Sequence, residues 1–303
     1  MNGSDRRQNT WLRFSVSRPG ALAAIEDMTG VDVKNAVGRQ IMYDGRYSLF
    51  HLDFLSVEEG KNMESRVLFL LGEGRLISLE PDRAPAPLDV AEARMARRGW
   101  SEDAFECFSL VLQSINDAAD EFLDALSDGI GEGLIQSNSV LENLDAKGKD
   151  FGVTDVVATQ VALGDIEELL SKCTQSLIQL DLAARHVTLR IPGDAAPLME
   201  RYRTLESDIA SMEESVDFVH DRVQVLQAVD SLALSVKQNQ IIKIFTVITA
   251  VFLPAVLVST YYSMNLAFFP ALDWKYIEPV TLLFTLLLAV LPIIYVKERG
   301  WLR

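Results

Sequence analysis

The stretch IFTVITAVFLPAVLVSTYY, residues 244–262, contains no charged side chain. A second uncharged stretch, PVTLLFTLLLAVLPIIYV, occupies residues 279–296, and only residues 263–278 separate the two. Each stretch is close to the roughly 20 apolar residues that an α-helix needs to cross the hydrocarbon core of a bilayer. The sequence therefore predicts a hairpin of two transmembrane helices. The alternative is a helical hairpin buried inside a soluble protein.

Basic residues predict how this hairpin is oriented. Lysines precede the first span and basic residues follow the second, whereas the connection carries one lysine and two acidic residues. The residues concerned are Lys237 and Lys243, then Lys297, Arg299 and Arg303, and in the connection Asp273, Lys275 and Glu278. Because basic segments stay on the cytoplasmic side, we expect both termini in the cytoplasm and the connection outside. Residues 1–10 are polar and lack the apolar core of a signal peptide, so we expect a multi-pass protein of the cell (inner) membrane.

Uncharged polar residues share one face of the first span with aliphatic residues. The face runs in steps of three and four through Asn239, Ile242, Thr246, Thr249, Leu253, Val256 and Thr260. Such a face lines a narrow pore if several copies of the helix surround an axis. Alternatively, the threonine hydroxyls bond to backbone carbonyls one turn back or join neighbouring helices. The pattern leaves both interpretations open, and the first requires a ring-shaped oligomer because one chain has too few helices.

The residues before the first span predict one long helix. Neither Gly nor Pro occurs between Pro197 and Pro254, and apolar residues recur in steps of three and four from Met199 to Val236. This spacing is typical of a coiled-coil-like helix that packs on a partner along its length. We therefore expect a stalk helix that continues directly into the first span.

The N-terminal part predicts a mixed α/β region followed by helices. Apolar runs bounded by turn residues predict strands at 11–16, 47–57, 66–71 and 75–80, the last two forming a hairpin across Gly72 and Gly74, and a short helix at 21–28. Helical patterns follow at 88–98, from an N-cap at Ser101 to about residue 126, and at 154–190. Three glycines at 129, 131 and 133 predict an interruption or bend between the last two.

These patterns predict an α+β membrane protein. Its expected parts are the α/β part of a cytoplasmic domain at residues 1–87, a helical acidic part at 88–196, the stalk helix at 197–243, the first span at 244–262, an extracytoplasmic loop at 263–278, the second span at 279–296 and a basic cytoplasmic tail at 297–303.

The formal net charge of −15 is concentrated in one part of the chain. Residues 101–181 hold 17 Asp and Glu against 3 Lys, so this region repels nucleic acid and attracts cations, although helices often carry such acid only for solvation. Cys107 and Cys173 fall in apolar helical patterns, which predicts buried free thiols. Neither a nucleotide-binding loop nor an acid–base or nucleophile constellation stands out, so the sequence argues against an enzyme.

The residues at the outer end of the first span carry a family signature. They read Tyr261, Tyr262, Ser263, Met264 and Asn265, and FPAL follows at 269–272. This pattern resembles the CorA family of divalent-cation channels, which includes ZntB-type zinc transporters and has the signature Tyr-Gly-Met-Asn followed by a Met-Pro-Glu-Leu loop. Four positions of the pore helix also agree with the family pattern: Asn239, Lys243, Thr246 and Pro254.

The resemblance implies a funnel-shaped homopentamer in which five first-span helices line the pore. Ser263, Met264 and Asn265 would form the selectivity loop, with the amide oxygen of Asn265 receiving a hydrated metal ion. Magnesium gives up its water reluctantly, so neutral oxygens can select the ion while it keeps its hydration shell. Phe245 and Leu253 would take the family's apolar gating positions.

The resemblance also implies the cargo and the partners. Mg²⁺, Zn²⁺ or Co²⁺ would move down its electrochemical gradient, with Asn239 forming a polar ring at the cytoplasmic end. No cofactor is expected, and the partners are further copies of the chain, the lipid bilayer and divalent cations, but no nucleic acid.

Two positions depart from the family signature. Ser263 replaces the signature glycine, which implies a modified outer turn, and Ala271 replaces the loop glutamate, which removes a negative charge that Asp273 could supply instead. Such changes also suit the alternative function, a non-conducting membrane-anchored sensor or scaffold. A membrane-tethered enzyme is the third interpretation.

Overall fold

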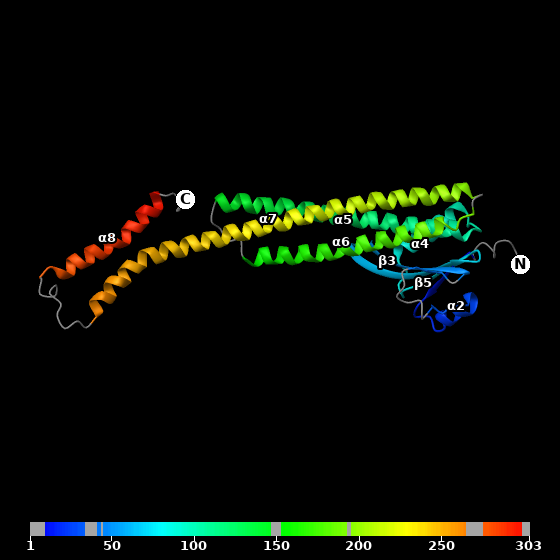
Figure 1. Cartoon of the computed structure of the whole chain (residues 1–303), viewed down its shortest axis with the longest axis horizontal. Helices are drawn as coiled ribbons and strands as arrows, with labels where there is room; N and C mark the ends of the chain where they lie inside the picture. The colour runs from blue at the N-terminus through cyan, green and yellow to red at the C-terminus, as the bar shows by residue number, and fades with distance from the viewer. Residues whose placement is uncertain are drawn as a thin grey trace. The chain divides into compact units, whose positions relative to one another are not determined.

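The structure is a computed structural model, and it describes residues 10–33, 41–43, 45–146, 153–192, 195–264 and 275–298. The chain divides into two compact units, Met1–Gln227 and Ala228–Arg303. Figure 1 labels the helices and two of the strands. In chain order the elements are β1 (Trp11–Ser15), α2 (Ala21–Thr29), β2 (Ile41–Tyr43), β3 (Tyr47–Glu58), β4 (Lys61–Gly72), β5 (Arg75–Glu80), α4 (Ala86–Arg98), α5 (Ala104–Ala146), α6 (Val153–Thr188), α7 (Ala196–Ser263) and α8 (Ile277–Glu298).

The predicted α/β region is confirmed and contains a sheet of five strands. The strand order is β1-β5-β4-β3-β2, with β1 parallel to β5 and every other pair antiparallel. The predicted hairpin across Gly72 and Gly74 joins β4 to β5. A second, longer hairpin joins β3 to β4 through Glu59 and Gly60, which both have positive φ as a tight hairpin turn requires. The sequence did not predict β2, because a three-residue strand carries too little periodicity to recognise.

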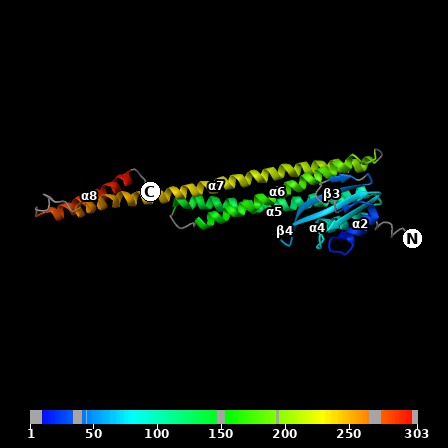
Figure 2. The same cartoon turned by 60° about the horizontal axis from the view of Figure 1, so that its bottom comes forward.

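Helices cover both faces of this sheet (Figures 1 and 2). On one face, Phe50, Phe69 and Leu76 belong to a hydrophobic core that also contains residues of α4, α5, α6 and α7. On the other face, Leu70 and Ile77 pack in a smaller core with α2. Strands buried on both faces explain why β4 contains a continuous apolar run rather than an alternating pattern.

The predicted interruption near residues 129–133 is wrong, because α5 is helical from Ala104 to Ala146. Each glycine lowers helix stability by only about 1 kcal/mol. Ile130 is buried in the large core, and such tertiary packing outweighs this cost. The predicted N-cap is also displaced: Asp103, rather than Ser101, accepts the N–H of Phe105 at 2.9 Å and begins the helix.

The predicted long helix is confirmed as α7, which continues through Pro254. In the first unit its apolar positions are buried in steps of three and four at Tyr202, Leu205, Ile209, Met212, Val216, Val219, Val223 and Leu226. The Tyr202 hydroxyl donates to the carbonyl of Phe105 at 2.8 Å, and Thr188 donates to Glu206 at 2.8 Å. The helix therefore packs on α5 and α6 of its own chain.

The stability of the folded protein should depend on pH through the protonation of His186. Arg190 donates to Ser48 Oγ at 3.0 Å, and the same hydroxyl lies 3.2 Å from His186 Nε2, within hydrogen-bond distance. Burial and then the charge of Arg190 lower the pKa of His186 below its ordinary value of about 6.5. The unfolded chain thus binds this proton more readily, so His186 contributes stability above about pH 6.5 that is lost as pH falls.

We therefore expect the melting temperature of the detergent-solubilised protein to fall between pH 7.5 and 5.5, and to fall less in His186→Gln, whose amide oxygen keeps an acceptor for Ser48. Thermal unfolding at each pH measures both curves. Parallel curves for the two proteins would show that His186 does not cause the dependence.

Both cysteines are buried, as predicted. Burial, with smaller effects of Glu106 and Asp103, raises the pKa of Cys107 to about 12, and burial raises that of Cys173 to about 11. Because the thiolate is the reactive form, neither thiol should react with a chromogenic disulfide reagent at pH 8 in the folded protein, and both should react after denaturation. A thiol titrated before denaturation would contradict this prediction.

Candidate functional site

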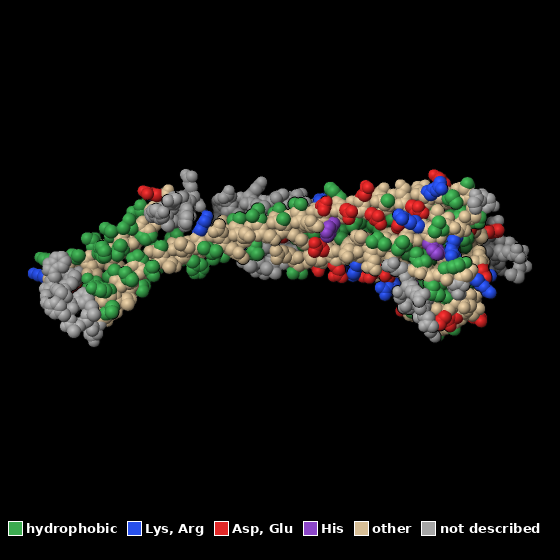
Figure 3. Space-filling model, in the orientation of Figure 1, with side chains coloured by type: hydrophobic (Ala, Val, Ile, Leu, Met, Phe, Trp, Pro, Cys, Tyr) green, Lys and Arg blue, Asp and Glu red, His purple; other side chains and the backbone are tan. Residues whose placement is uncertain are grey.

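The second unit presents a large apolar surface. Among the described residues, α7 alone is long and apolar enough to cross a membrane, and none of its apolar window is buried; a shorter apolar helix, Glu278–Ile294, lies within α8. Figure 3 shows hydrophobic side chains covering α8 and the end of α7, whereas acidic side chains gather over the helices of the first unit. Side chains such as Leu253, 63% exposed, and Leu257, 70% exposed, need a cover of lipid or of further protein chains.

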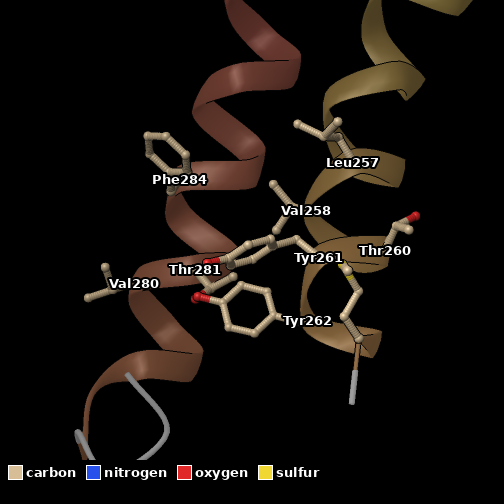
Figure 4. Close-up of a pocket in the computed structure, with 9 residues that line it drawn as sticks. Leu257, Val258, Thr260, Tyr261, Tyr262, Val280, Thr281 and Phe284 are labelled. Carbon is tan, nitrogen blue, oxygen red and sulfur yellow. The ribbon is translucent and has the colours of Figure 1, made fainter. Parts of the chain in front are cut away.

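All the residues predicted to line a pore lie on the exposed surface of α7 in the single chain. They are Asn239, Ile242, Phe245, Thr246, Thr249, Leu253, Val256 and Thr260. In Figure 4, Thr260 points away from α8, whereas the ring of Tyr262 points toward it. At the level of Thr260, α8 of the same chain therefore leaves the predicted pore face of α7 uncovered.

The hydroxyls of Thr246 and Thr260 on this face bond to their own helix. Thr246 Oγ1 donates to the carbonyl of Ile242, and Thr260 Oγ1 donates to the carbonyl of Val256, both at 2.8 Å. This is the backbone bonding that the sequence left open as an alternative. It is compatible with a pore, because a hydroxyl whose hydrogen is committed to a carbonyl still presents its lone pairs outward. Water molecules around a cation direct their hydrogens outward, so acceptors of this kind suit a hydrated cation.

The predicted selectivity loop begins at the end of α7. Ser263 Oγ donates to the carbonyl of Thr260 at 2.8 Å, and the N–H of Met264 donates to the carbonyl of Tyr261 at 3.4 Å, so both residues complete the last helical turn. Asn265, the predicted metal-ion ligand of the loop, lies outside the described residues.

A cavity of about 560 Å³ lies between α7 and α8 next to this turn (Figure 4). Its lining is largely apolar and consists of Leu257, Val258, Thr260, Tyr261, Tyr262, Met264, Val280, Thr281 and Phe284. The Thr281 hydroxyl donates to the Tyr262 hydroxyl at 3.0 Å, which connects the two helices. The sequence patterns did not predict this pair; the available signal was a hydroxyl early in the second span and a tyrosine directly before Ser263.

The acidic region of the first unit attracts cations without forming a defined site in its described part. Burial and, to a smaller extent, the nearby carboxylates of Asp124 and Asp117 raise the pKa of Asp120. Across the ranges that the structure describes, no three His, Cys, Asp or Glu side chains gather closely enough to hold a metal ion. The negative field therefore comes from charge spread over helix surfaces.

Several solved structures have the same fold. The CorA magnesium transporter from Methanocaldococcus jannaschii matches with a TM-score of 0.71 and 15% identity, covering 96% of this chain and 90% of that one. The full-length CmaX protein matches with a TM-score of 0.67 and 16% identity, covering 96% and 88%. The cytoplasmic domain of ZntB from Vibrio parahaemolyticus matches with a TM-score of 0.57 and 14% identity, covering 74% and 87%. At these identities the matches establish the fold alone.

Sequence comparison identifies the family. The magnesium transport protein CorA of Escherichia coli strain K12 is 27% identical over 240 residues, which are 78% of this chain and 72% of that protein. The CorA protein of Salmonella typhimurium has the same identity and coverage. The model of the family described as CorA-like Mg²⁺ transporter protein matches residues 7–298. The resemblance read from the sequence is thus confirmed, and the chain belongs to the CorA-like Mg²⁺ transporter family.

Proposed function

We propose that this protein is a divalent-cation channel of the cell (inner) membrane in which five copies of the α7 span surround a pore. The observation that carries the proposal is the face of α7 from Asn239 to Thr260, which is exposed in the single chain and, at Thr260, points away from α8. An uncharged polar face whose hydroxyl lone pairs point outward suits a water-filled lumen. Five copies brought together on this face would cover the surface that a single chain leaves open.

The proposed lumen favours hydrated magnesium as the cargo. Its predicted lining offers an amide and hydroxyl oxygens but neither imidazole nor thiolate, and Mg²⁺ prefers oxygen ligands and keeps part of its water. Zn²⁺ and Co²⁺ would pass only as hydrated competitors. Asn265 would receive the ion outside, and Asn239 would meet it at the cytoplasmic end.

The lumen would be closed by apolar side chains. Phe245 and Leu253 are 65% and 63% exposed in the single chain and lie one on either side of Thr249. In a ring of copies, such residues exclude water from the axis and block a hydrated ion until the ring widens. Opening would let the membrane potential drive the ion inward, at about 2.3 kcal/mol per charge for each 100 mV.

The proposed topology places both termini of the chain in the cytoplasm. α7 and α8 would both cross the bilayer, and the 22 residues of α8 span about 33 Å at 1.5 Å per residue. Lys243 before the first span and Lys297 at the end of α8 would lie on the cytoplasmic side.

Uptake into liposomes tests the proposal. We expect reconstituted protein to carry Mg²⁺ to an encapsulated dye, and Asn265→Ala to lower the rate at least about tenfold, because it removes the amide oxygen expected to receive the ion. The oligomeric mass in detergent should be that of five chains for both proteins. Wild-type uptake equal to that of empty liposomes, or a mass of one or two chains, would overturn the channel proposal in favour of a membrane-anchored scaffold.

A further inference from the structure

We propose that Thr281 is a positioning residue for the selectivity loop, acting through the hydroxyl of Tyr262. This inference rests on the proposed channel function and adds to it a residue of α8, the helix that lies away from the proposed lumen. Thr281 would hold the last turn of α7 at the place where the loop begins.

The contact is direct and joins the two helices close to their outer ends. Thr281 lies in the second turn of α8, and its hydroxyl donates to the Tyr262 hydroxyl at 3.0 Å. Figure 4 shows the Tyr262 ring extending from α7 toward Thr281. The ring is also in edge contact with Tyr261, with centroids 5.8 Å apart and planes at 86°. Tyr262 is therefore held by its neighbour on α7 and by its hydroxyl on α8.

The cavity beside this hydrogen bond is lined mainly by apolar side chains, among them Val258, Val280 and Phe284. The bond itself is exposed, so it should act as an ordinary neutral hydrogen bond rather than one strengthened by burial. It links α7 to α8 directly across this cavity.

The hydrogen bond between Tyr262 and Thr281 lies where α7 ends and α8 begins, next to the predicted selectivity residues. Tyr262 immediately precedes Ser263, and Thr281 lies 19 residues further on, so the bond closes the connection that contains the predicted selectivity residues. The Ser263 and Met264 bonds to α7 carbonyls hold the same turn from within the helix.

Loss of the bond should therefore weaken ion recognition more than conduction. The lumen-facing residues of α7 should stay in place, whereas the last turn of α7, which carries Ser263 and Met264, would lose its link to α8. We expect Thr281→Val, which keeps the shape of the side chain and removes the hydroxyl, to raise the apparent KM for Mg²⁺ about fivefold, the factor expected for one neutral hydrogen bond. The maximal rate should change less than about twofold.

The test compares Thr281→Val, Tyr262→Phe and the double variant in the liposome assay. Both single variants should raise KM to the same extent, and the double variant should raise it no further, because either change removes the same bond. Thr281→Ser should retain the wild-type KM. The matched control is Thr285→Val, one turn along α8, whose hydroxyl donates to the carbonyl of Thr281 on its own helix at 2.8 Å. Equal KM values for Thr281→Val and Thr285→Val would overturn the inference.

Thermal unfolding in detergent tests the contact without transport. The melting temperature should fall in both single variants, and the double variant should melt no lower than either. Additive shifts would show that the two hydroxyls act independently and would overturn the inference. Absence of wild-type uptake would instead reject the channel proposal, and additivity of the melting shifts would still decide whether the contact exists.

Discussion

Replacing Thr246 with lysine should lower divalent-cation uptake at least about 100-fold, whereas replacing it with glutamate should leave uptake measurable. In the proposed ring every copy contributes one charge to the same level of the lumen. A lysine about 5 Å from a dication raises its energy by about 2 kcal/mol even at the dielectric constant of water, and five lysines act together. Salt screens part of this repulsion, but several kcal/mol remain, and each 1.4 kcal/mol corresponds to a factor of ten. Glutamate at the same level attracts the ion.

The opposite charges of the lysine and glutamate variants provide the control. Thr246 is the third residue of the predicted first span, so both long side chains can reach the cytoplasmic interface if the helix face meets lipid. Both variants would then suffer a similar insertion defect and a similar loss of protein in the membrane. Dye-reported uptake, normalised to the amount of pentamer reconstituted, separates the two cases. Equal normalised uptake by the two variants would place Thr246 against lipid and reject the proposed lumen.

The second large effect is expected in the cytoplasmic unit. Phe108→Ala should lower the free energy of unfolding by about 3–5 kcal/mol, because it removes a fully buried ring and leaves a cavity. Phe108 stacks on Phe50 with centroids 5.0 Å apart and packs on Phe69 at 5.6 Å, so it ties α5 to two central strands. Contacts between aromatic rings add about 0.5–1.5 kcal/mol per pair to the effect of burial.

Urea denaturation in detergent, followed by tryptophan fluorescence, to which the buried Trp11 contributes, measures this loss. Phe108→Leu keeps most of the apolar volume and should lose less than half as much stability as Phe108→Ala. Leu189→Ala is the exposed control: Leu189 is 87% exposed near the end of α6, and its truncation should change stability by no more than about 0.5 kcal/mol. Similar losses for Phe108→Ala and Leu189→Ala would mean that the aromatic contacts do not stabilise the unit.

Several features of this protein could be predicted from local sequence alone. The long helix α7 was recognisable because apolar residues recur with helical spacing and no glycine or proline intervenes before Pro254. The hairpin from β4 to β5 was recognisable because Gly74 supplies the positive φ of a tight turn between two apolar runs. The family could be predicted from a few consecutive residues around Ser263. Each of these signals lies within a short stretch of chain, so no distant contact is needed to interpret it.

The tertiary structure decided what depends on residues far apart in the chain. The parallel pairing of β1 with β5 joins Trp11 to Leu76, and no local pattern specifies such a partner. The glycines near Ile130 predicted a break, but packing of that residue in the core keeps α5 continuous. The bond between Tyr262 and Thr281 arises only when α7 and α8 lie side by side. Periodicity and charge act over a few residues and are readable from the sequence, whereas pairing and packing depend on which distant surfaces meet.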